Sequence, residues 1–463
     1  MTAEVALSLA GDHYRLLQRH LLPGDGKEAA AIGLCGRRAG AGRHKLLVRE
    51  IHPVPYAICS ARAPDRIAWP VTWLDPLLEK AEREGLSIVK FHSHPADYRQ
   101  FSNTDDASDE ALFAGIHGWL DRDIPHASAA MLADGAIFGR AIWPDGSMPA
   151  LATIAVVGDD LRFWHARHAS LPQTIGVGRP TLAFGRAMMG ELAHLTAAVV
   201  GASGTGSIVI EQLYRMGFGR LVLIDPEAVD IKNLNRIVNA RRRHARSGAL
   251  KVDTAAEAIG EAGLGTEVEL YPVNIVDRSA VAAVASTDII FGCVDSAEGR
   301  DVLNRICSYY LLPYIDVGVG IVPLPDGRID EINGVVHYLK PGGSSLLSRG
   351  AFRPEQVAAD ALRRQNPKLY EERRREKYIE GAGEEGPAVI TVNMTMASLA
   401  ANECLARLYR TRNLPNREYA ELRMSLTEME IETIAEGEPC RVLAKHAGEG
   451  DAEPLLGLPE LSV

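Results

Sequence analysis

A regular alternation of apolar runs and helical patterns after about residue 180 limits the possible folds of this chain more than any other feature. The apolar runs TAAVVG, RLVLIDPE, DIIFGCVD and LLPYIDVG are separated by segments in which apolar residues recur at helical spacing. Strands that alternate with helices form a parallel sheet, because each crossover helix packs on one of its faces. The sequence therefore predicts an α/β domain with a doubly wound, mainly parallel sheet over residues 181–412.

The N-terminal third shows a mixed pattern instead. Residues 7–22 are expected to form an amphipathic helix, and EAAAIGLCGR, HKLLVREIHPVP and LSIVKFHSH are expected to form strands. Because a chain of 463 residues is too long for one hydrophobic core, we expect a separate α+β domain over residues 1–164. Residues 165–180 lack periodicity and are rich in Gly, Pro, Ser and His, which predicts a linker.

Two later segments interrupt the globular pattern. Residues 341–386 combine Gly and Ser with a heavily charged stretch, which predicts a long mobile loop or a solvated helix. Residues 413–463 are expected to form a mixed C-terminal tail.

Composition narrows the class of protein. The formal net charge of −10 argues against specific binding to nucleic acid. The six cysteines occur singly, without a Cys-x-x-Cys pair, which favours a reducing compartment. The sequence has neither a signal-peptide pattern nor an apolar run of membrane length. We therefore expect a cytoplasmic protein with no membrane partner.

The stretch FHSHPADYRQFSNTDD contains a candidate metal site. On a strand, His92 and His94 lie two residues apart and present both imidazoles on one face, and Asp105 could supply a third ligand. Three protein ligands leave one tetrahedral position for water, as hydrolysis requires. An alternative interpretation is structural, because Ser102-x-x-Asp105 before an apolar-periodic run is also typical of a helix capping box.

His-x-His-Pro followed by Ser-x-x-Asp resembles the JAMM/MPN zinc metalloproteases over about residues 1–160. The resemblance implies Zn²⁺ as cofactor and cleavage of isopeptide bonds after ubiquitin-like proteins. It also implies that an early glutamate, best matched by Glu28 with Glu50 as the fallback, acts as general base and acid. Ser102 would hold the polarised carbonyl oxygen or the geometry of the site.

A second candidate site begins with VVGASGTGS, which follows a strand and opens a helix. Gly201, Gly204 and Gly206 allow backbone N–H groups to approach phosphates, and Asp225 ends the next strand, where it could accept ribose hydroxyls. A nicotinamide-dependent oxidoreductase would share these features. The next residues suit it poorly, because Arg236 beside phosphates favours a triphosphate.

This constellation as a whole resembles the ThiF-type, Rossmann-like adenylyltransferases that activate ubiquitin-like and sulfur-carrier proteins, over about residues 179–410. The resemblance implies adenylation of a partner's C-terminal carboxylate by ATP with Mg²⁺, a homodimer, and a crossover loop at 341–386. The matching residues are Gly201, Gly204, Gly206, Asp225, Asn233, Arg236, Lys251, Asp295, Arg300 and Asn304.

Relatives often carry a catalytic cysteine or a zinc-binding Cys-x-x-Cys after a Pro-Gly. Here PGGSSLLSRG places Ser345 and Ser348 in that region, and residues 308–403 contain no cysteine, so we expect no structural zinc in the second domain. Cys440 and Ser345 are the two candidate acyl acceptors. In a third alternative, the adenylate passes directly to a partner's thiol.

The sequence thus predicts a bifunctional enzyme of a bacterial ubiquitin-like pathway. One domain would trim or release a ubiquitin-like protein, and the other would adenylate its C-terminus. A conjugating-enzyme-like protein or a sulfur donor would be a further partner. The alternatives are activation of a sulfur carrier for cofactor or amino-acid biosynthesis, a scaffold with one inactive site, and a nicotinamide oxidoreductase.

Overall fold

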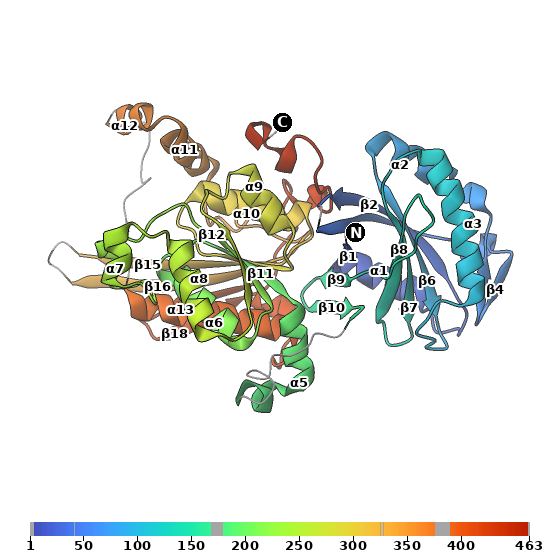
Figure 1. Ribbon diagram of the computed structural model, residues 1–463, viewed down its shortest axis with the longest axis horizontal. Coiled ribbons are helices and arrows are strands. Elements are labelled where there is room, and N and C mark those ends of the chain that lie inside the picture. The colour runs from blue at the N-terminus through green and yellow to red at the C-terminus, as the bar shows by residue number, and fades with distance from the viewer. Residues whose placement is uncertain are drawn as a thin grey trace. The chain divides into compact units, whose positions relative to one another are not determined.

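The computed structural model describes residues 4–40, 42–167, 179–324, 326, 328–375 and 389–461. The chain divides into two compact units, the first comprising residues 1–168 with 309–311 and 446–457, and the second comprising the rest. Most of the predicted linker and the later part of the predicted crossover loop lie outside the described residues. The two units are described separately below (Figure 1).

The first unit is built on an eight-stranded mixed sheet with the order β10-β9-β1-β3-β2-β6-β7-β8. Its N-terminal strand corrects the predicted helix over residues 7–22, because residues up to Ala10 are a strand and α1 begins at Gly11. The strand residues after Glu4 are all buried, so they show no alternation that would separate a strand from a helix. The strands are β1 (Glu4–Ala10), β2 (Ala30–Arg38), β3 (Arg43–Pro53), β6 (Ser87–His94), β7 (His126–Leu132), β8 (Ile137–Ile142), β9 (Thr153–Val157) and β10 (Leu161–His165), with a separate β4 (Ala61–Ala63) and β5 (Arg66–Ala68) hairpin.

Helices cover both faces of this sheet. One apolar core includes Tyr14, Leu17 and Leu21 of α1 (Gly11–Leu21). The core on the other face holds α2 (Asp75–Glu84) and α3 (Asn103–Leu120) against Ile32, Leu34 and Ile88 of β2 and β6. Side chains at every second position of β6 point to the same face, so His92 and His94 share the face of Ile88. The two candidate metal ligands on this strand therefore lie on the face that α2 and α3 cover.

Residues 446–457, from the predicted tail, belong to the first unit. Gly450 forms a bridge to Arg37 at the end of β2, and the Asp451 carboxylate accepts a 2.7 Å hydrogen bond from the Ala39 N–H. A side chain at Gly36 would meet the Gly448 carbonyl oxygen at 2.1 Å, so the contact requires glycine there. Residues 446–457 thus pack against the end of β2 within the first unit.

The second unit also contains an eight-stranded sheet, with the order β13-β12-β11-β14-β15-β16-β17-β18. The pairings from β13 to β15 are parallel, as predicted, and those from β15 to β18 are antiparallel. The strands are β11 (Thr196–Val200), β12 (Arg220–Ile224), β13 (Glu267–Tyr271), β14 (Ile289–Gly292), β15 (Tyr314–Pro323), β16 (Ile329–Leu339), β17 (Glu421–Ser425) and β18 (Glu430–Ile434).

The chain reverses its direction across the sheet between β11 and β14. From β11 it proceeds outward to β12 and β13, and then returns to the other side of β11 to form β14 and β15. Such a switch point leaves a crevice at the carboxyl ends of the strands, where doubly wound folds bind ligands. Helices lie on both faces of the sheet (Figure 1): α5 (Arg179–His194), α6 (Gly204–Met216), α7 (Arg242–Ser247), α8 (Lys251–Ala262), α9 (Arg278–Ala285), α10 (Ala297–Tyr309) and α13 (Ile390–Leu408).

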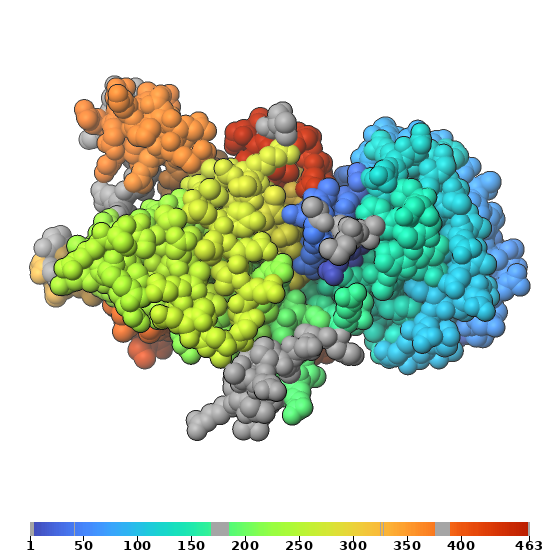
Figure 2. Space-filling view, in the orientation of Figure 1, coloured from blue at the N-terminus to red at the C-terminus, as the bar shows by residue number. Residues whose placement is uncertain are grey.

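The region predicted as a loop contains two helices, α11 (Pro354–Gln365) and α12 (Pro367–Arg375). They form the orange lobe at the edge of the second unit in Figure 2. α11 is fixed to the start of α10, because Asp360 accepts a 2.7 Å hydrogen bond from the Ala297 N–H and Arg364 forms an ion pair with Glu298. α12 corresponds to the predicted solvated helix.

Candidate functional site

The three predicted metal ligands converge at the end of β6 and the start of α3. The Nε2 atoms of His92 and His94 lie 3.0 Å apart, and they lie 3.2 and 3.6 Å from the two carboxylate oxygens of Asp105. Both histidines are buried, with exposed fractions of 2% and 4%. Burial opposes ionisation of Asp105, but its hydrogen bonds with the two imidazoles hold the pKa of its carboxyl well below the usual range.

The donor set fits a zinc ion. His94 Nδ1 lies 2.6 Å from the Tyr98 carbonyl oxygen, an acceptor that requires the proton on Nδ1. When the ring is neutral and its proton is on Nδ1, the lone pair of Nε2, which faces His92 and Asp105, could bind a metal ion. A backbone carbonyl that accepts from the other ring nitrogen commonly orients a zinc-binding histidine, and two imidazoles with one carboxylate match the ligand set of hydrolytic zinc sites.

The contacts of Ser102 agree with both interpretations of this segment, a metal site and a helix capping box. Its hydroxyl and its backbone N–H donate hydrogen bonds of 2.7 and 2.8 Å to Asp105 Oδ2, and its Oγ accepts one from the Asp105 N–H. This arrangement is a capping box at the N-terminus of α3. The cap fixes the carboxylate that faces the histidines, so the capping role and a role at the metal site are compatible.

Glu28 lies close to the metal ligands, whereas Glu50 has other partners. Burial, and then the negative charge of Asp105, raise the pKa of Glu28 to about 7. The register of β2 and β6 pairs Ala30 with His92, which places Glu28 beside the end of β6. Glu50, on β3, forms an ion pair with Lys80 of α2, and its carboxylate lies 3.0 Å from Nε2 of His52 on the same strand.

The predicted glycine loop joins β11 to α6 at the switch point of the second sheet. Gly201 has a φ of +92°, which favours glycine. A side chain at Gly206 would lie 1.7 Å from the Gly201 carbonyl oxygen, and one at Gly204 would lie 2.4 Å from Asn393 Nδ2. Local geometry therefore favours glycine at Gly201 and Gly206, where a side chain would meet backbone atoms, whereas a side chain at Gly204 would have to displace the Asn393 amide.

Asp225 and Lys251 meet beside this loop. Asp225 directly follows the last residue of β12. It is buried and accepts a 2.7 Å hydrogen bond from the Ala202 N–H. Lys251 Nζ lies 3.9 Å from Asp225 and forms an ion pair with Glu227. Burial raises the pKa of Asp225, although Lys251 opposes this shift. The structure thus brings together the loop, the acid and the lysine that the sequence singled out separately.

Arg236 and Asn233 both lie in the segment after β12, but they make different contacts. The side-chain stem of Arg236 lies beside Gly204, within 3.3 Å of where a Cβ would stand, and its Nη1 donates to the Lys232 carbonyl oxygen. Asn233 is buried, and its Oδ1 accepts a hydrogen bond from the Asp230 N–H in a capping box. Arg236 is therefore placed at the loop, whereas the amide of Asn233 has a structural partner.

Asp295 lies three residues beyond the end of β14 and is exposed to solvent. A side chain at Gly201 would contact the backbone of Cys293 and Val294, so Asp295 follows directly on the segment that touches the glycine loop. Arg300 lies further along, in α10, 3.4 Å from the buried Asp316 carboxylate. Asp295 thus lies at the carboxyl edge of the sheet, next to the switch point.

Sequence reasoning missed two residues beside this site. Asn393, in α13, contacts the glycine loop, and Asp360, in α11, accepts a hydrogen bond from the N-terminus of α10. Both lie far along the chain from the motifs that they touch. Their positions depend on tertiary packing, and no local pattern in the sequence indicates them.

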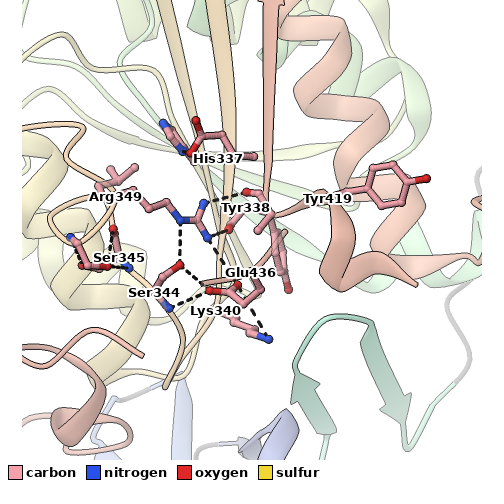
Figure 3. Close-up of polar contacts among 12 residues, drawn as sticks. His337, Tyr338, Lys340, Ser344, Ser345, Arg349, Tyr419 and Glu436 are labelled. Atoms are coloured by element: carbon pink, nitrogen blue, oxygen red, sulfur yellow. Dashed lines mark hydrogen bonds and ion pairs between the residues drawn. The ribbon is translucent and has the colours of Figure 1, made fainter. Parts of the chain in front are cut away.

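The candidate acyl acceptors lie in one region of the second unit. Ser345 Oγ accepts a hydrogen bond from the Ser348 N–H, so its described contacts supply no general base. The neighbouring Ser344 hydroxyl donates to Glu436 and accepts from Arg349, as Figure 3 shows. Cys440 lines a pocket of about 510 Å³ together with Ser344, Ser348 and Arg349. Cys440 is 2% exposed, which limits the access of an acyl group to its thiol.

The second unit defines a nucleotide-binding class of fold, with a glycine loop and an acidic strand end at the switch point of a doubly wound sheet. Residues 178–442 match the ThiF family, and the chain belongs to that family. Residues 11–135 match the family of prokaryotic homologs of the JAB domain. The predicted fusion of a JAMM/MPN-type domain to a ThiF-type domain is thereby confirmed.

Curated relatives are similar over part of this chain. Ubiquitin-like modifier-activating enzyme 5 of Oryza sativa subsp. japonica is 29% identical over 178 residues, which cover 36% of this chain and 39% of the relative. The Caenorhabditis elegans enzyme of the same name is 28% identical over 178 residues, with the same coverage. A crystal structure of E. coli MccB with MccA-N7isoASN is 16% identical, with a TM-score of 0.45 over 60% of this chain and 77% of that one. The chain thus spans about four-tenths of the length of these curated relatives.

Among the residues that the structure describes, every helix is too short or too polar to cross a lipid bilayer.

Proposed function

We propose that this protein is a bifunctional enzyme that trims or releases a ubiquitin-like protein and activates the C-terminus of that protein with ATP. The observation that supports this most strongly is the grouping at the switch point of the glycine loop, Asp225, Lys251 and Arg236, in a chain of the ThiF family. The grouping of His92, His94 and Asp105 supports the hydrolytic half.

In the hydrolytic half, His92, His94 and Asp105 would hold Zn²⁺. A bound zinc ion would supply Lewis acidity, which polarises a carbonyl group and acidifies water. Glu28 accepts a proton from the attacking water and returns it to the leaving amine as the amide C–N bond breaks. A carboxyl with a pKa of about 7 can perform both transfers near neutral pH. Ser102 orients Asp105 and would stabilise the carbonyl oxygen.

In the activating half, a C-terminal carboxylate oxygen of the partner attacks the α-phosphorus of ATP. A new O–P bond forms, the bond to pyrophosphate breaks, and an acyl-adenylate with a good leaving group results. The glycine loop binds phosphates through backbone N–H groups, and Asp225 accepts the ribose hydroxyls. Arg236 and Lys251 neutralise the charge of the leaving pyrophosphate, and Asp295 would hold Mg²⁺.

After adenylation, the acyl group has three possible destinations: the Cys440 thiol, the Ser345 hydroxyl, or the thiol of a conjugating-enzyme-like partner. Transfer to the partner agrees best with the burial of Cys440 and with the lack of a base among the described contacts of Ser345. A cytoplasmic homodimer is the proposed assembly. Activation of a sulfur carrier is the second candidate, because its adenylation step is the same and only the final acceptor differs.

Mass spectrometry of a ubiquitin-like substrate with extra C-terminal residues tests both halves. The substrate is incubated with the wild type, His92→Ala or Asp295→Ala, with and without Mg²⁺ and ATP. Loss of trimming only in His92→Ala and loss of AMP transfer only in Asp295→Ala would support two separable activities. A thiocarboxylate product instead of a lysine conjugate would favour the sulfur-carrier pathway. If neither trimming nor adenylation occurs, the scaffold alternative is favoured, and NAD binding without any response to Mg²⁺ and ATP would favour the oxidoreductase.

A further inference from the structure

A buried ion cluster lies directly beside the candidate metal site. Lys90 and Arg140 both form ion pairs with Asp109, whose side chain is completely buried. Arg140 donates through Nε and Nη2 to the same Asp109 oxygen, at 3.1 and 2.7 Å, and its Nη1 donates to Asp106. Lys90 and Arg140 are only 7% and 8% exposed. Removal of one partner from such a cluster leaves an uncompensated buried charge, so its members strongly constrain one another.

The strand register places this cluster one row away from the histidines. Lys90 of β6 lies beside Ser128 of β7, which in turn lies beside Arg140 of β8. The next row on the same face contains His92 of β6, Ala130 of β7 and Phe138 of β8. Two residues along a strand correspond to about 6.6 Å. Lys90 and Arg140 therefore lie on the same face of the sheet as the two histidines, one row earlier, and both rows face α3.

Helix α3 carries two aspartates whose spacing along the helix matches the spacing between the two rows of the sheet. Asp105 and Asp109 are four residues apart, so they lie on one face of the helix and are separated by about 6 Å along its axis. Asp105 faces His92 and His94, and Asp109 faces Lys90 and Arg140. A helix that slid or rotated over β6 would separate both pairs together. The Asp109 contacts therefore determine where the Asp105 carboxylate stands relative to the histidines.

Arg140 also acts through an aromatic contact. Its guanidinium lies 4.0 Å from the centre of the Phe101 ring, and Phe101 directly precedes the Ser102 cap of α3. The Phe101 ring in turn lies 6.0 Å from the His92 ring and 5.1 Å from the Phe138 ring. Arg140 thus contacts both the segment that enters α3 and the first turns of the helix itself.

From these contacts we infer that Lys90, Asp109 and Arg140 are positioning residues for the metal site. Their ion pairs set the register of α3 over β6 and so place Asp105 as the third ligand, without contacting metal or substrate themselves. This inference rests on the proposed metal site. It assigns the cluster a role in metal affinity beyond its contribution to the stability of the fold.

The test measures zinc binding by the apo full-length chain in competition with a chromophoric chelator. The variants are Arg140→Lys, which keeps the charge and loses the two-point contact, and Asp106→Asn, which removes one Arg140 partner at a half-exposed position. Lys90→Met removes the other cation. Ile116→Val is the matched control, because Ile116 is buried on the same helix among apolar neighbours. The melting temperature of each apo variant and its visible spectrum with Co²⁺ are recorded in parallel.

We expect zinc affinity to fall about 10–100-fold in Lys90→Met and Arg140→Lys and by a smaller factor in Asp106→Asn, with a changed Co²⁺ spectrum. Ile116→Val should lower the melting temperature of the apo protein without changing zinc affinity. If the cluster variants lower only the melting temperature and bind zinc like the wild type, the cluster is purely structural and the inference is wrong. If the wild type itself binds no zinc, the proposed metal site fails instead.

Discussion

The two candidate sites differ in how much of the chain builds them. The candidate metal site of the first unit takes its three ligands and its cap from residues 92–105, which form one strand, one loop and the start of one helix. The candidate nucleotide site of the second unit combines the ends of β11, β12 and β14 with Asn393 of α13. A local site depends on the register of one helix over one strand, whereas a distributed site depends on the packing of a whole sheet. Perturbations should therefore affect the two sites in different ways.

The largest effect is expected from Gly206→Ala in the second unit. The new Cβ would lie 1.7 Å from the Gly201 carbonyl oxygen, and a backbone atom cannot move aside without breaking the turn between β11 and α6. We expect ATP–pyrophosphate exchange to be lost and the second unit to be destabilised by more than about 2 kcal/mol. Trimming by the first unit should continue.

Ser203→Ala is the matched control for the glycine loop. Ser203 is the N-cap residue of α6, and its side chain makes no capping hydrogen bond. An alanine there should leave exchange within about two-fold of the wild type, because the loop would bind phosphates through backbone N–H groups. Equal losses in Gly206→Ala and Ser203→Ala would contradict a backbone-based site.

The next largest effect is expected from Glu28→Gln in the first unit. The substitution keeps the shape of the side chain and removes its ability to accept a proton. Trimming should fall about 10²–10⁴-fold while zinc content and adenylation stay unchanged. Glu50→Gln is the control, because Glu50 pairs with Lys80 and His52. If Glu50→Gln abolished trimming and Glu28→Gln did not, the two glutamates would have to exchange roles.

A smaller effect is expected from Ser102→Ala, which tests how the local site is held. The variant loses a cap worth about 1 kcal/mol and the two-way hydrogen bonding with Asp105. Zinc affinity should fall about 10-fold, since the carboxylate loses its orienting partner. Asp277→Ala removes a comparable N-cap from α9 in the second unit, so it should cost similar stability without changing zinc affinity. Zinc affinity equal to that of the wild type in Ser102→Ala would limit Ser102 to capping.

The same difference explains what could be predicted from the sequence. The convergence of His92, His94 and Asp105 was predictable because strand period and helix capping are local rules. The role of Arg140 was not, because its contact with Asp109 depends on the pairing of β7 with β8. The mainly parallel sheet followed from alternation, but residues 7–10 of β1 were predicted as the start of a helix because the strand is buried on both faces. Asn393 could not be placed from any motif, since it reaches the glycine loop only through tertiary packing.

The last effect is confined to acid pH and concerns stability, in which the two units should differ. Burial, helped by the charge of His117, lowers the pKa of His126 in the first unit from 6.5 to about 3. As the pH falls, the His126 imidazole is protonated in the unfolded chain at a higher pH than in the folded protein. The free energy of unfolding therefore falls as the pH drops from 6.5 to 3. In the second unit, burial opposes ionisation of Glu421, but His337 and Arg423 outweigh it and lower its pKa from 4.5 to about 2. The contribution of the ionised Glu421 to folding stability is complete above pH 4.5 and is lost as the pH falls through 2.

Tryptophan fluorescence separates these contributions, because all five tryptophans lie in the first 164 residues. The variant His126→Asn should flatten the fall in fluorescence-detected stability between pH 6.5 and 3. Glu421→Gln should leave that curve unchanged and should flatten the loss of hydrogen-exchange protection in β17 between pH 4.5 and 2, by an amount on the order of 1–3 kcal/mol. If Glu421→Gln shifted the tryptophan curve, the two units would unfold as one cooperative body. The local metal site would then depend on the second unit as fully as the distributed site does.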